Sequence, residues 1–152
     1  MEEIVVKAIE AMRRRDFDVH AVQDAQQARE LVLSMIPAGA SVGVGGSMTI
    51  RELGLIPALE ARGSKVWWHW LNLAERNMIY ENARKADFYL ASSNAVTRDG
   101  SLVNIDGQAN RVAAMIQGPK HVILVIGSQK VVDGGVNAAS ARIREQACPP
   151  NA

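Results

Sequence analysis

The chain has 152 residues, of which 48% are apolar and 22% charged, and its formal net charge is +1. This length and composition are those of an ordinary globular protein, so we expect a single domain over residues 1–152 and exclude a disordered chain. A net charge near zero provides no overall attraction to nucleic acid or to an anionic membrane. The one cysteine, Cys148, cannot form an internal disulfide, and no base stands near it in the sequence.

Neither a leader nor a membrane span is predicted. The chain begins with the acidic pair Glu2-Glu3, whereas a signal peptide begins with basic residues ahead of a long apolar stretch. The apolar run over residues 122–126 is far shorter than the roughly 20 residues that a spanning helix needs. We therefore expect a cytoplasmic protein, with no membrane and no nucleic acid among its partners.

Apolar residues recur at helical spacing in some segments and at strand spacing in others, in alternation along the chain. The pattern predicts, in order, a helix over 2–15, a strand over 17–22, a helix over 24–35, a strand over 41–44, a helix from 47 or 49 to 63, a strand over 65–70 and a helix over 73–85. It then predicts a strand over 88–91, a hairpin over 97–105, a helix over 110–115, a strand over 121–126 and a helix over 136–146 that stops at Pro149-Pro150.

Several of these strands are apolar on both faces, which is typical of a sheet covered on both sides. The predicted fold class is therefore a three-layer α/β fold, with a mostly parallel sheet and helices on both faces. Asp99-Gly100 predicts a local β-hairpin within it. Asp24 is the expected cap of the second helix, and Thr49 with Glu52 fits a capping box, for which Ser47 is the alternative cap.

The first candidate binding segment is the glycine-rich turn after the strand at 41–44. Gly45 and Gly46 let backbone N–H groups approach a ligand closely, and Ser47 and Thr49 add hydroxyl groups at a helix start. Arg51 adds a cation, so a phosphate or a carboxylate would suit this segment. The segment is neither the dinucleotide fingerprint nor a P-loop. The alternative is a tight turn that needs glycine for steric reasons alone.

The second candidate segment is rich in polar residues among apolar neighbours. Asn94 follows a buried strand and Thr97 lies close to it, while Asn110 and Arg111 stand at another helix start. Arg111 can bind a carboxylate or a phosphate through two hydrogen bonds, and Asp106 can act as an acid or base or can hold Arg111. The alternative is turn chemistry, because Asn, Asp and Gly dominate turns.

The segment Lys65–Trp70 holds three tryptophans in four residues. Strand alternation places Trp68 and Trp70 on one face, and Trp67 and His69 on the other. The segment is either a ligand wall or subunit interface, where tryptophan is enriched, or ordinary strand packing. The histidines are weak candidates for chemistry, because none has a second ligand at metal-binding spacing, and we predict no metal site.

Two strings of residues resemble the LUD domain family, also described as LutC/YkgG-like lactate utilisation proteins. The first string is Gly45-Gly46-Ser47-Met48-Thr49-Ile50-Arg51-Glu52-Leu53-Gly54. The second runs from Ser93-Asn94-Ala95-Val96-Thr97 through Asp99-Gly100, Leu102-Val103-Asn104-Ile105-Asp106-Gly107 and Asn110-Arg111-Val112-Ala113-Ala114-Met115-Ile116 to Gly118-Pro119-Lys120. The resemblance covers nearly the whole chain.

The resemblance implies a fold similar to that of the NagB/RpiA/CoA transferase-like proteins, whose relatives bind phosphorylated or carboxylated small molecules. Some members of the family are encoded with an iron–sulfur system that oxidises lactate to pyruvate. The sequence departs from the family's pattern at two places. Ala109 occupies a position where the family usually has glycine, and the chain stops at residues 147–152, where some longer members continue into a cysteine-rich tail. We expect no iron–sulfur cluster within this chain and a tail missing beyond it.

Three hypotheses about function follow. In the first, the protein handles a small anionic metabolite between the Gly45–Thr49 turn and the polar residues around Arg111, with Asp106 as the acid or base of any reaction. In the second, it is a non-catalytic accessory or regulatory subunit of a redox complex, or a homo-oligomer, that docks through Trp67–Trp70. The third is a sugar-phosphate isomerase or a CoA transferase-like enzyme, by analogy of fold alone.

Overall fold

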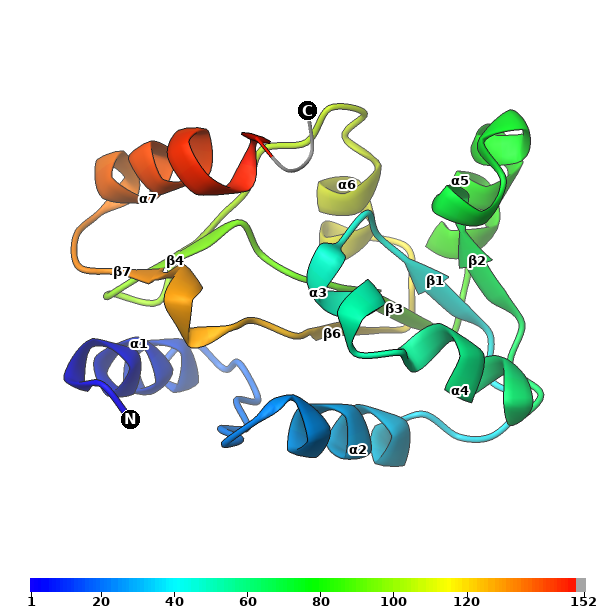
Figure 1. Cartoon of the computed structure of the whole chain (residues 1–152), viewed down its shortest axis with the longest axis horizontal. Helices are drawn as coiled ribbons and strands as arrows, with labels where there is room; N and C mark the ends of the chain where they lie inside the picture. The colour runs from blue at the N-terminus through cyan, green and yellow to red at the C-terminus, as the bar shows by residue number, and fades with distance from the viewer. Residues whose placement is uncertain (150–152) are drawn as a thin grey trace. The chain divides into compact units, whose positions relative to one another are not determined.

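The structure is a computed structural model that describes residues 1–149, and these residues form two compact units (Figure 1). The first unit contains Met1–Ala21, Ser93–Ile105 and the described residues from Ile126 onward. The second unit contains Val22–Ser92 and Asp106–Val125. The expectation of a single domain stays a prediction. No helix among residues 1–149 is long and apolar enough to cross a bilayer.

The second unit is built on a sheet of four parallel strands in the order β2-β1-β3-β6. The strands are β1 (Val42–Val44), β2 (Val66–Trp68), β3 (Phe88–Ala91) and β6 (His121–Leu124). Its helices are α2 (Ala25–Met35), α3 (Met48–Glu52), α4 (Leu55–Ala61), α5 (Arg76–Arg84) and α6 (Asn110–Ile116), with short 3-10 turns at His69–Leu71 and Leu73–Glu75. This arrangement confirms the predicted α/β class with a mostly parallel sheet.

Alternate residues of the strands enter two different apolar clusters. On β3, Leu90 packs in the cluster formed with α2, α3 and α4, whereas Tyr89 packs in the cluster formed with α5 and α6. Trp68 and Trp67 divide in the same way on β2, and the ring of Trp70 lies 5.2 Å from that of Trp68. The sheet is therefore buried on both faces, which explains why its strands read as continuous apolar runs.

The first unit contains a smaller sheet in the order β5-β4-β7. Strand β4 (Ala95–Thr97) pairs antiparallel with β5 (Leu102–Val103), which is the hairpin predicted at Asp99-Gly100, and parallel with β7 (Val131–Val132). The other elements are α1 (Glu3–Arg13), a 3-10 turn at Ser128–Lys130, and α7 (Val136–Arg142) followed by a π-helical turn over Ile143–Ala147. Strand β7 was not predicted, because two residues are too few to show a period.

Three predicted local features differ from the structure. Residues 17–22 form no strand, and Phe17 is 44% exposed, so the alternation there does not reflect a half-buried face. The cap of α3 is Ser47, whose Oγ accepts a hydrogen bond from the N–H of Ile50 (3.3 Å), and Thr49 lies inside the helix. The helix predicted from 47 or 49 to 63 is divided into α3 and α4 at Gly54, whose φ is +61°. The predicted stop at Pro149-Pro150 lies partly outside the described residues.

The carboxylate of Asp87 joins the amino ends of three neighbouring strands. It accepts hydrogen bonds from the N–H (3.0 Å) and the hydroxyl (2.9 Å) of Ser41, just before β1, and from Nζ of Lys120 (2.6 Å), just before β6. The hydrogen bond from Lys120, followed by those from Ser41, lowers the pKa of Asp87 to about 2. The carboxylate therefore stays ionised in the folded protein under conditions that protonate an ordinary aspartate.

We expect this network to contribute to acid stability. A folded-state pKa of about 2, below the ordinary value of 3.8, means that the contribution is present above about pH 4 and is lost as the pH falls toward 2. Chemical denaturation of Asp87→Asn between pH 6 and pH 2 should show a smaller acid-induced loss of stability than the unmodified chain. Asp133→Asn, at an exposed carboxylate, is the control and should keep the full loss. Equal losses in Asp87→Asn and the unmodified chain would contradict this account.

Candidate functional site

The carboxyl ends of the parallel strands bring several polar and aromatic residues of the second unit to one edge of its sheet. Gly45 follows β1, His69 follows β2 and Ser92 follows β3. The N–H of Gly45 donates a hydrogen bond to the carbonyl of Leu90 (2.9 Å), which continues the pairing of β1 with β3. Ligands of open α/β sheets bind at this edge, so it is the place to examine for a site.

Side chains pack closely against both glycines of the turn, Gly45 and Gly46. A methyl group added to Gly45 would lie 3.0 Å from Cγ of Arg111 and 3.1 Å from the hydroxyl oxygen of Tyr89. A methyl group on Gly46 would lie 3.3 Å from the ring of Trp70 and 3.5 Å from Cε1 of His69. Neither glycine has a positive φ. A side chain at Gly45 would therefore crowd Arg111 and Tyr89, whereas at Gly46 the contact with Trp70 is only slightly tight and that with His69 is ordinary van der Waals contact.

Arg111 and Asp106 form a buried ion pair. Nε and Nη2 of Arg111 donate to Oδ1 of Asp106 at 2.9 Å and 2.7 Å, and Nη1 donates to the carbonyl of Ser92 at 2.8 Å. The other carboxylate oxygen accepts from the N–H of Val112 (2.7 Å), in the first turn of α6. The side chains are 7% and 9% exposed, respectively. Asp106 thus holds Arg111 and also satisfies a backbone donor at the start of α6.

Tyr89 lies beside this pair as a neutral phenol. Burial raises the pKa of Tyr89 far above its ordinary value, and the negative charge of Asp106 raises it further, against a smaller opposite effect of Arg111. Its hydroxyl therefore stays protonated at neutral pH, where it can donate or accept a hydrogen bond.

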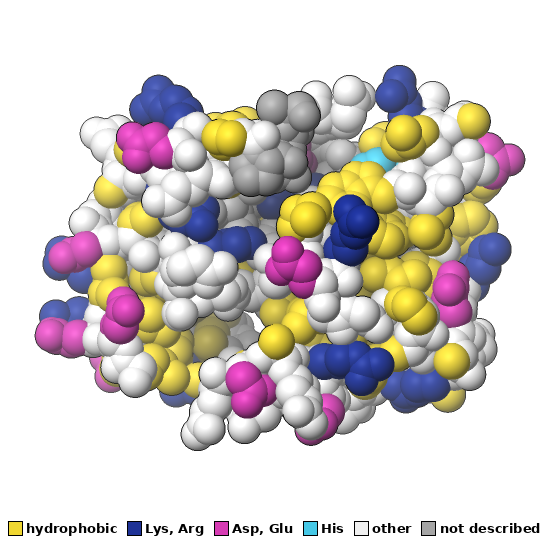
Figure 2. All heavy atoms as spheres, in the orientation of Figure 1, with side chains coloured by type: hydrophobic (Ala, Val, Ile, Leu, Met, Phe, Trp, Pro, Cys, Tyr) yellow, Lys and Arg dark blue, Asp and Glu magenta, His cyan; other side chains and the backbone are white. Residues whose placement is uncertain are grey.

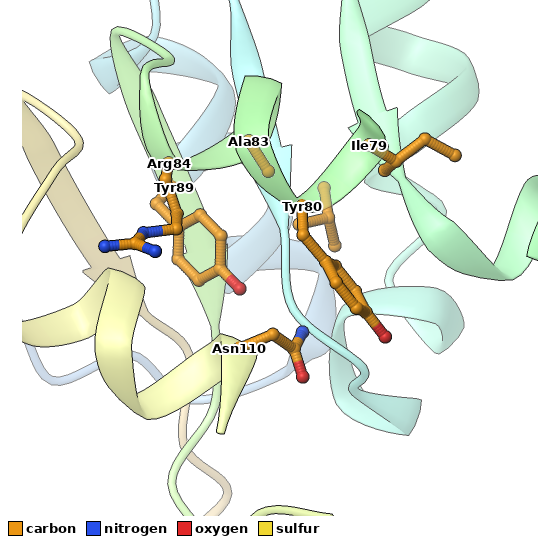
Figure 3. A pocket seen from close by; sticks show the side chains of 7 residues that line it. Ile79, Tyr80, Ala83, Arg84, Tyr89 and Asn110 are labelled. Carbon is orange, nitrogen blue, oxygen red and sulfur yellow. The ribbon is translucent and has the colours of Figure 1, made fainter. Parts of the chain in front are cut away.

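A narrow crevice opens between α5, β3 and the start of α6 (Figure 3). Tyr80 and Asn110 direct their polar groups to the same end of it, and the hydroxyl of Tyr89 points inward between them, while the guanidinium of Arg84 points away (Figure 3). The crevice has no room for a water molecule. A ligand would bind at its mouth or displace the side chain of Tyr80.

The predicted site residues divide between the two units. Asp106 lies in the second unit together with most of the predicted binding residues, namely Gly45, Gly46, Ser47, Thr49, Asn110 and Arg111. Ser47 is buried and caps α3, Thr49 lies in its first turn, and Arg51 is exposed.

Asn94 and Thr97 belong to the first unit and stabilise its hairpin. Oδ1 of Asn94 accepts from the N–H of Ile105 (2.9 Å), and its own N–H donates to Oδ1 of Asn104 (3.0 Å). The hydroxyl of Thr97 donates to Asp99 and accepts from the N–H of Ser101 (3.0 Å). These contacts agree with the turn chemistry that was the alternative explanation for this segment.

Tyr80 and Tyr89 were missed as site residues, and His69 and Trp70 were predicted only as part of a segment that could be a ligand wall or an interface. His69 and Trp70 come directly after β2, so the rule that drew attention to the residues after β1 and β3 would have found them. Tyr80 and Tyr89 lie within a helix and a strand, where apolar periodicity accounts for them equally well. No group of three or more His, Cys, Asp or Glu side chains that could hold a metal ion occurs among residues 1–149.

The structure defines a mixed α/β protein with a parallel sheet in its second unit, and its surface shows acidic and basic side chains interspersed in the view of Figure 2. The family model of the LUD domain matches residues 5–152. The chain therefore belongs to the LUD domain family, a family associated with lactate utilisation, as the two strings predicted. No curated protein and no solved structure matched the chain.

Ala109 has a φ of +57°, at the position where the resemblance to the family implies a glycine. A left-handed backbone costs a residue with a side chain roughly 1–2 kcal/mol, which glycine avoids at the expense of a more flexible unfolded chain. We expect Ala109→Gly to raise the free energy of unfolding by about 1 kcal/mol, measured by denaturant titration. Ala113→Gly, inside α6, is the control and should lower it by about 1 kcal/mol. A loss of stability in Ala109→Gly would contradict this explanation.

Breaking the buried pair should be costly. Asp106→Ala leaves the guanidinium of Arg111 buried without its carboxylate and removes the acceptor for Val112, so we expect a loss of about 3 kcal/mol in the free energy of unfolding. Asp133→Ala breaks an exposed pair with Arg98 and should cost at most about 0.5 kcal/mol. Similar losses in the two variants, measured by the same denaturant titration, would show that Arg111 does not depend on Asp106.

Proposed function

We propose that this LUD domain binds a small anionic metabolite, a carboxylate or a phosphate, at the Gly45–Gly46 turn and the adjoining mouth of the crevice. The observation that carries the proposal is the convergence of the glycine turn, the Arg111 side chain and Asn110 at the carboxyl edge of a parallel sheet. The family's association with lactate utilisation supports a small organic acid as the first ligand to test.

The residues of the turn have separate parts in this proposal. Asn110 is half-buried at the mouth and offers an amide to the ligand, while the side chain of Arg111, paired with Asp106, packs against Gly45 and holds the turn in place. Ser47 and Thr49 shape the start of α3. Asp106 is a positioning residue for Arg111 in the structure, and its role as an acid or base stays a prediction. Asn94 and Thr97 are kept in the proposal only as residues of the hairpin.

A docking function is the second candidate, and one observation favours it. Leu71 and Leu73, directly after the tryptophan segment, are 59% and 66% exposed, whereas Trp68 is buried in the core. An accessory subunit would therefore dock through these leucines rather than through Trp68. Under this proposal, Leu71→Ser with Leu73→Ser weakens association with a redox partner or a second copy and leaves ligand binding unchanged.

The binding proposal is tested by thermal shift with lactate, pyruvate, glycolate and inorganic phosphate. A ligand that binds only the folded protein stabilises it by mass action, by about 2.7 kcal/mol at a concentration a hundred times its dissociation constant. We expect at least one of these anions to raise the melting temperature. Asn110→Asp places a negative charge at the mouth and should abolish the rise.

The matched control is Asn137→Asp, which makes the same substitution in the first turn of α7, in the other unit. It should leave the ligand-induced rise intact. If none of the four anions changes the melting temperature, or if Asn137→Asp abolishes the rise as well, the proposed binding site is wrong.

A further inference from the structure

His69 is buried, and the described part of the chain offers no hydrogen-bond partner to one of its ring nitrogens. It is 9% exposed, at the carboxyl end of β2, and its Nδ1 has no hydrogen-bond partner among residues 1–149. Burying an imidazole nitrogen without a partner costs free energy, because its hydrogen bond to water is lost and not replaced. An orphaned nitrogen at the ligand-binding edge of a sheet therefore indicates a group whose partner arrives with a ligand.

The polar edge of the ring faces the glycine turn. Cε1, the carbon between the two ring nitrogens, is the ring atom nearest to Gly46, at 3.5 Å from the position of an added methyl group. The ring of Tyr80 from α5 meets the imidazole edge-on, with centroids 5.0 Å apart, and that of Trp70 lies at 6.1 Å. His69 thus lies between the turn and Tyr80, one of the residues that line the crevice.

The charges around this site sum to zero. Arg111 is neutralised by Asp106, Tyr89 is a neutral phenol, and Tyr80 is the titratable side chain in ring contact with His69. The charged residues of the packed elements are exposed, where water screens them: Arg51, Glu52, Glu75, Arg76, Glu81 and Arg84. An anion bound at the turn would therefore lack one positive charge.

We propose that His69 supplies that charge: it takes up a proton as the ligand binds and hydrogen-bonds the carboxylate of a small monocarboxylic acid. The inference rests on the proposed anion-binding function and names the class of ligand. One proton balances one negative charge, so a monocarboxylate suits the site, whereas a phosphate brings a second charge near neutral pH. The aromatic walls of Tyr80 and Trp70 suit the apolar part of such an acid.

The linkage has a definite sign. Burial lowers the pKa of His69 below its ordinary value of 6.5, so the imidazole is neutral in the free protein at neutral pH. A carboxylate against the ring favours the charged form and raises the pKa in the complex. Between the free and the bound pKa, binding takes up nearly one proton, and affinity falls by up to about tenfold for each unit of rising pH.

The experiment is calorimetric titration of the full chain with lactate and with pyruvate at pH 6.5, in two buffers of different ionisation enthalpy. Both probes stay fully ionised there, so the buffer dependence counts protons taken up by the protein. We expect the protein to take up a substantial fraction of a proton for each ligand bound.

NMR titration of the histidine ring protons in the unmodified chain, with and without the probe, should show that the pKa of one of the three histidines rises when the probe is present. His69→Gln should bind more weakly and without proton uptake, while His121→Gln, at an exposed histidine of β6, should behave as the unmodified chain.

The outcomes separate the two proposals. If neither acid binds and phosphate does not bind either, the anion site and the role of His69 both fail. If phosphate binds and the acids do not, or if either acid binds without proton uptake, the site stands and the role of His69 is wrong. Proton uptake that persists in His69→Gln, or that disappears in His121→Gln, also overturns it. The NMR titration decides the question if His69→Gln does not fold.

Discussion

The buried side chain of Arg111 is the constraint on which the edge of the second unit depends. Its alkyl chain packs against Gly45, its guanidinium holds the carbonyl of Ser92 after β3, and its partner Asp106 satisfies the first turn of α6. One side chain therefore joins the turn after β1, the end of β3 and the start of α6. Because a buried guanidinium is tolerated only when it is paired, Asp106 is as necessary to this edge as Arg111 itself.

The packing of side chains against Gly45 and Gly46 explains these glycines better than a role in a phosphate-binding loop does. A phosphate loop uses glycine to bring its own backbone up to a ligand, with its N–H groups free. Here the N–H of Gly45 donates a hydrogen bond to Leu90 of β3, and side chains lie within 3.5 Å of the position that a Cβ would take at Gly45 or Gly46. The chemistry at this edge therefore belongs to the side chains that flank the turn, with Arg111 and Tyr89 at Gly45 and His69 and Trp70 at Gly46.

The sequence predicts the fold better than the site. The elements of the fold carry local signals in the sequence, whereas the site depends on contacts between distant segments. The parallel sheet follows from strands that are apolar on both faces, and the hairpin from Asp99-Gly100, since both signals are local. The false strand over residues 17–22 has the right alternation but no neighbouring strand to cover it. At the site, the pairing of Asp106 with Arg111 depends on a loop conformation that no period encodes, so the sequence left open whether these residues pair or face a ligand.

His69 shows where a local reading loses information. Taken along the chain it is one polar residue among three tryptophans, and core packing explains it. In the sheet, however, β2 lies parallel to β1, and the carboxyl ends of adjacent parallel strands meet at the same edge. His69, directly after β2, therefore lies beside the glycine turn that follows β1. The histidine then lies across the glycine turn from a neutral ion pair, and imidazole is a side chain whose charge can change near neutral pH. At a site whose permanent charges cancel, an imidazole that takes up a proton would add favourable charge to the hydrogen bonds that neutral donors offer an anion, and His69 lies against the turn where we propose that the anion binds.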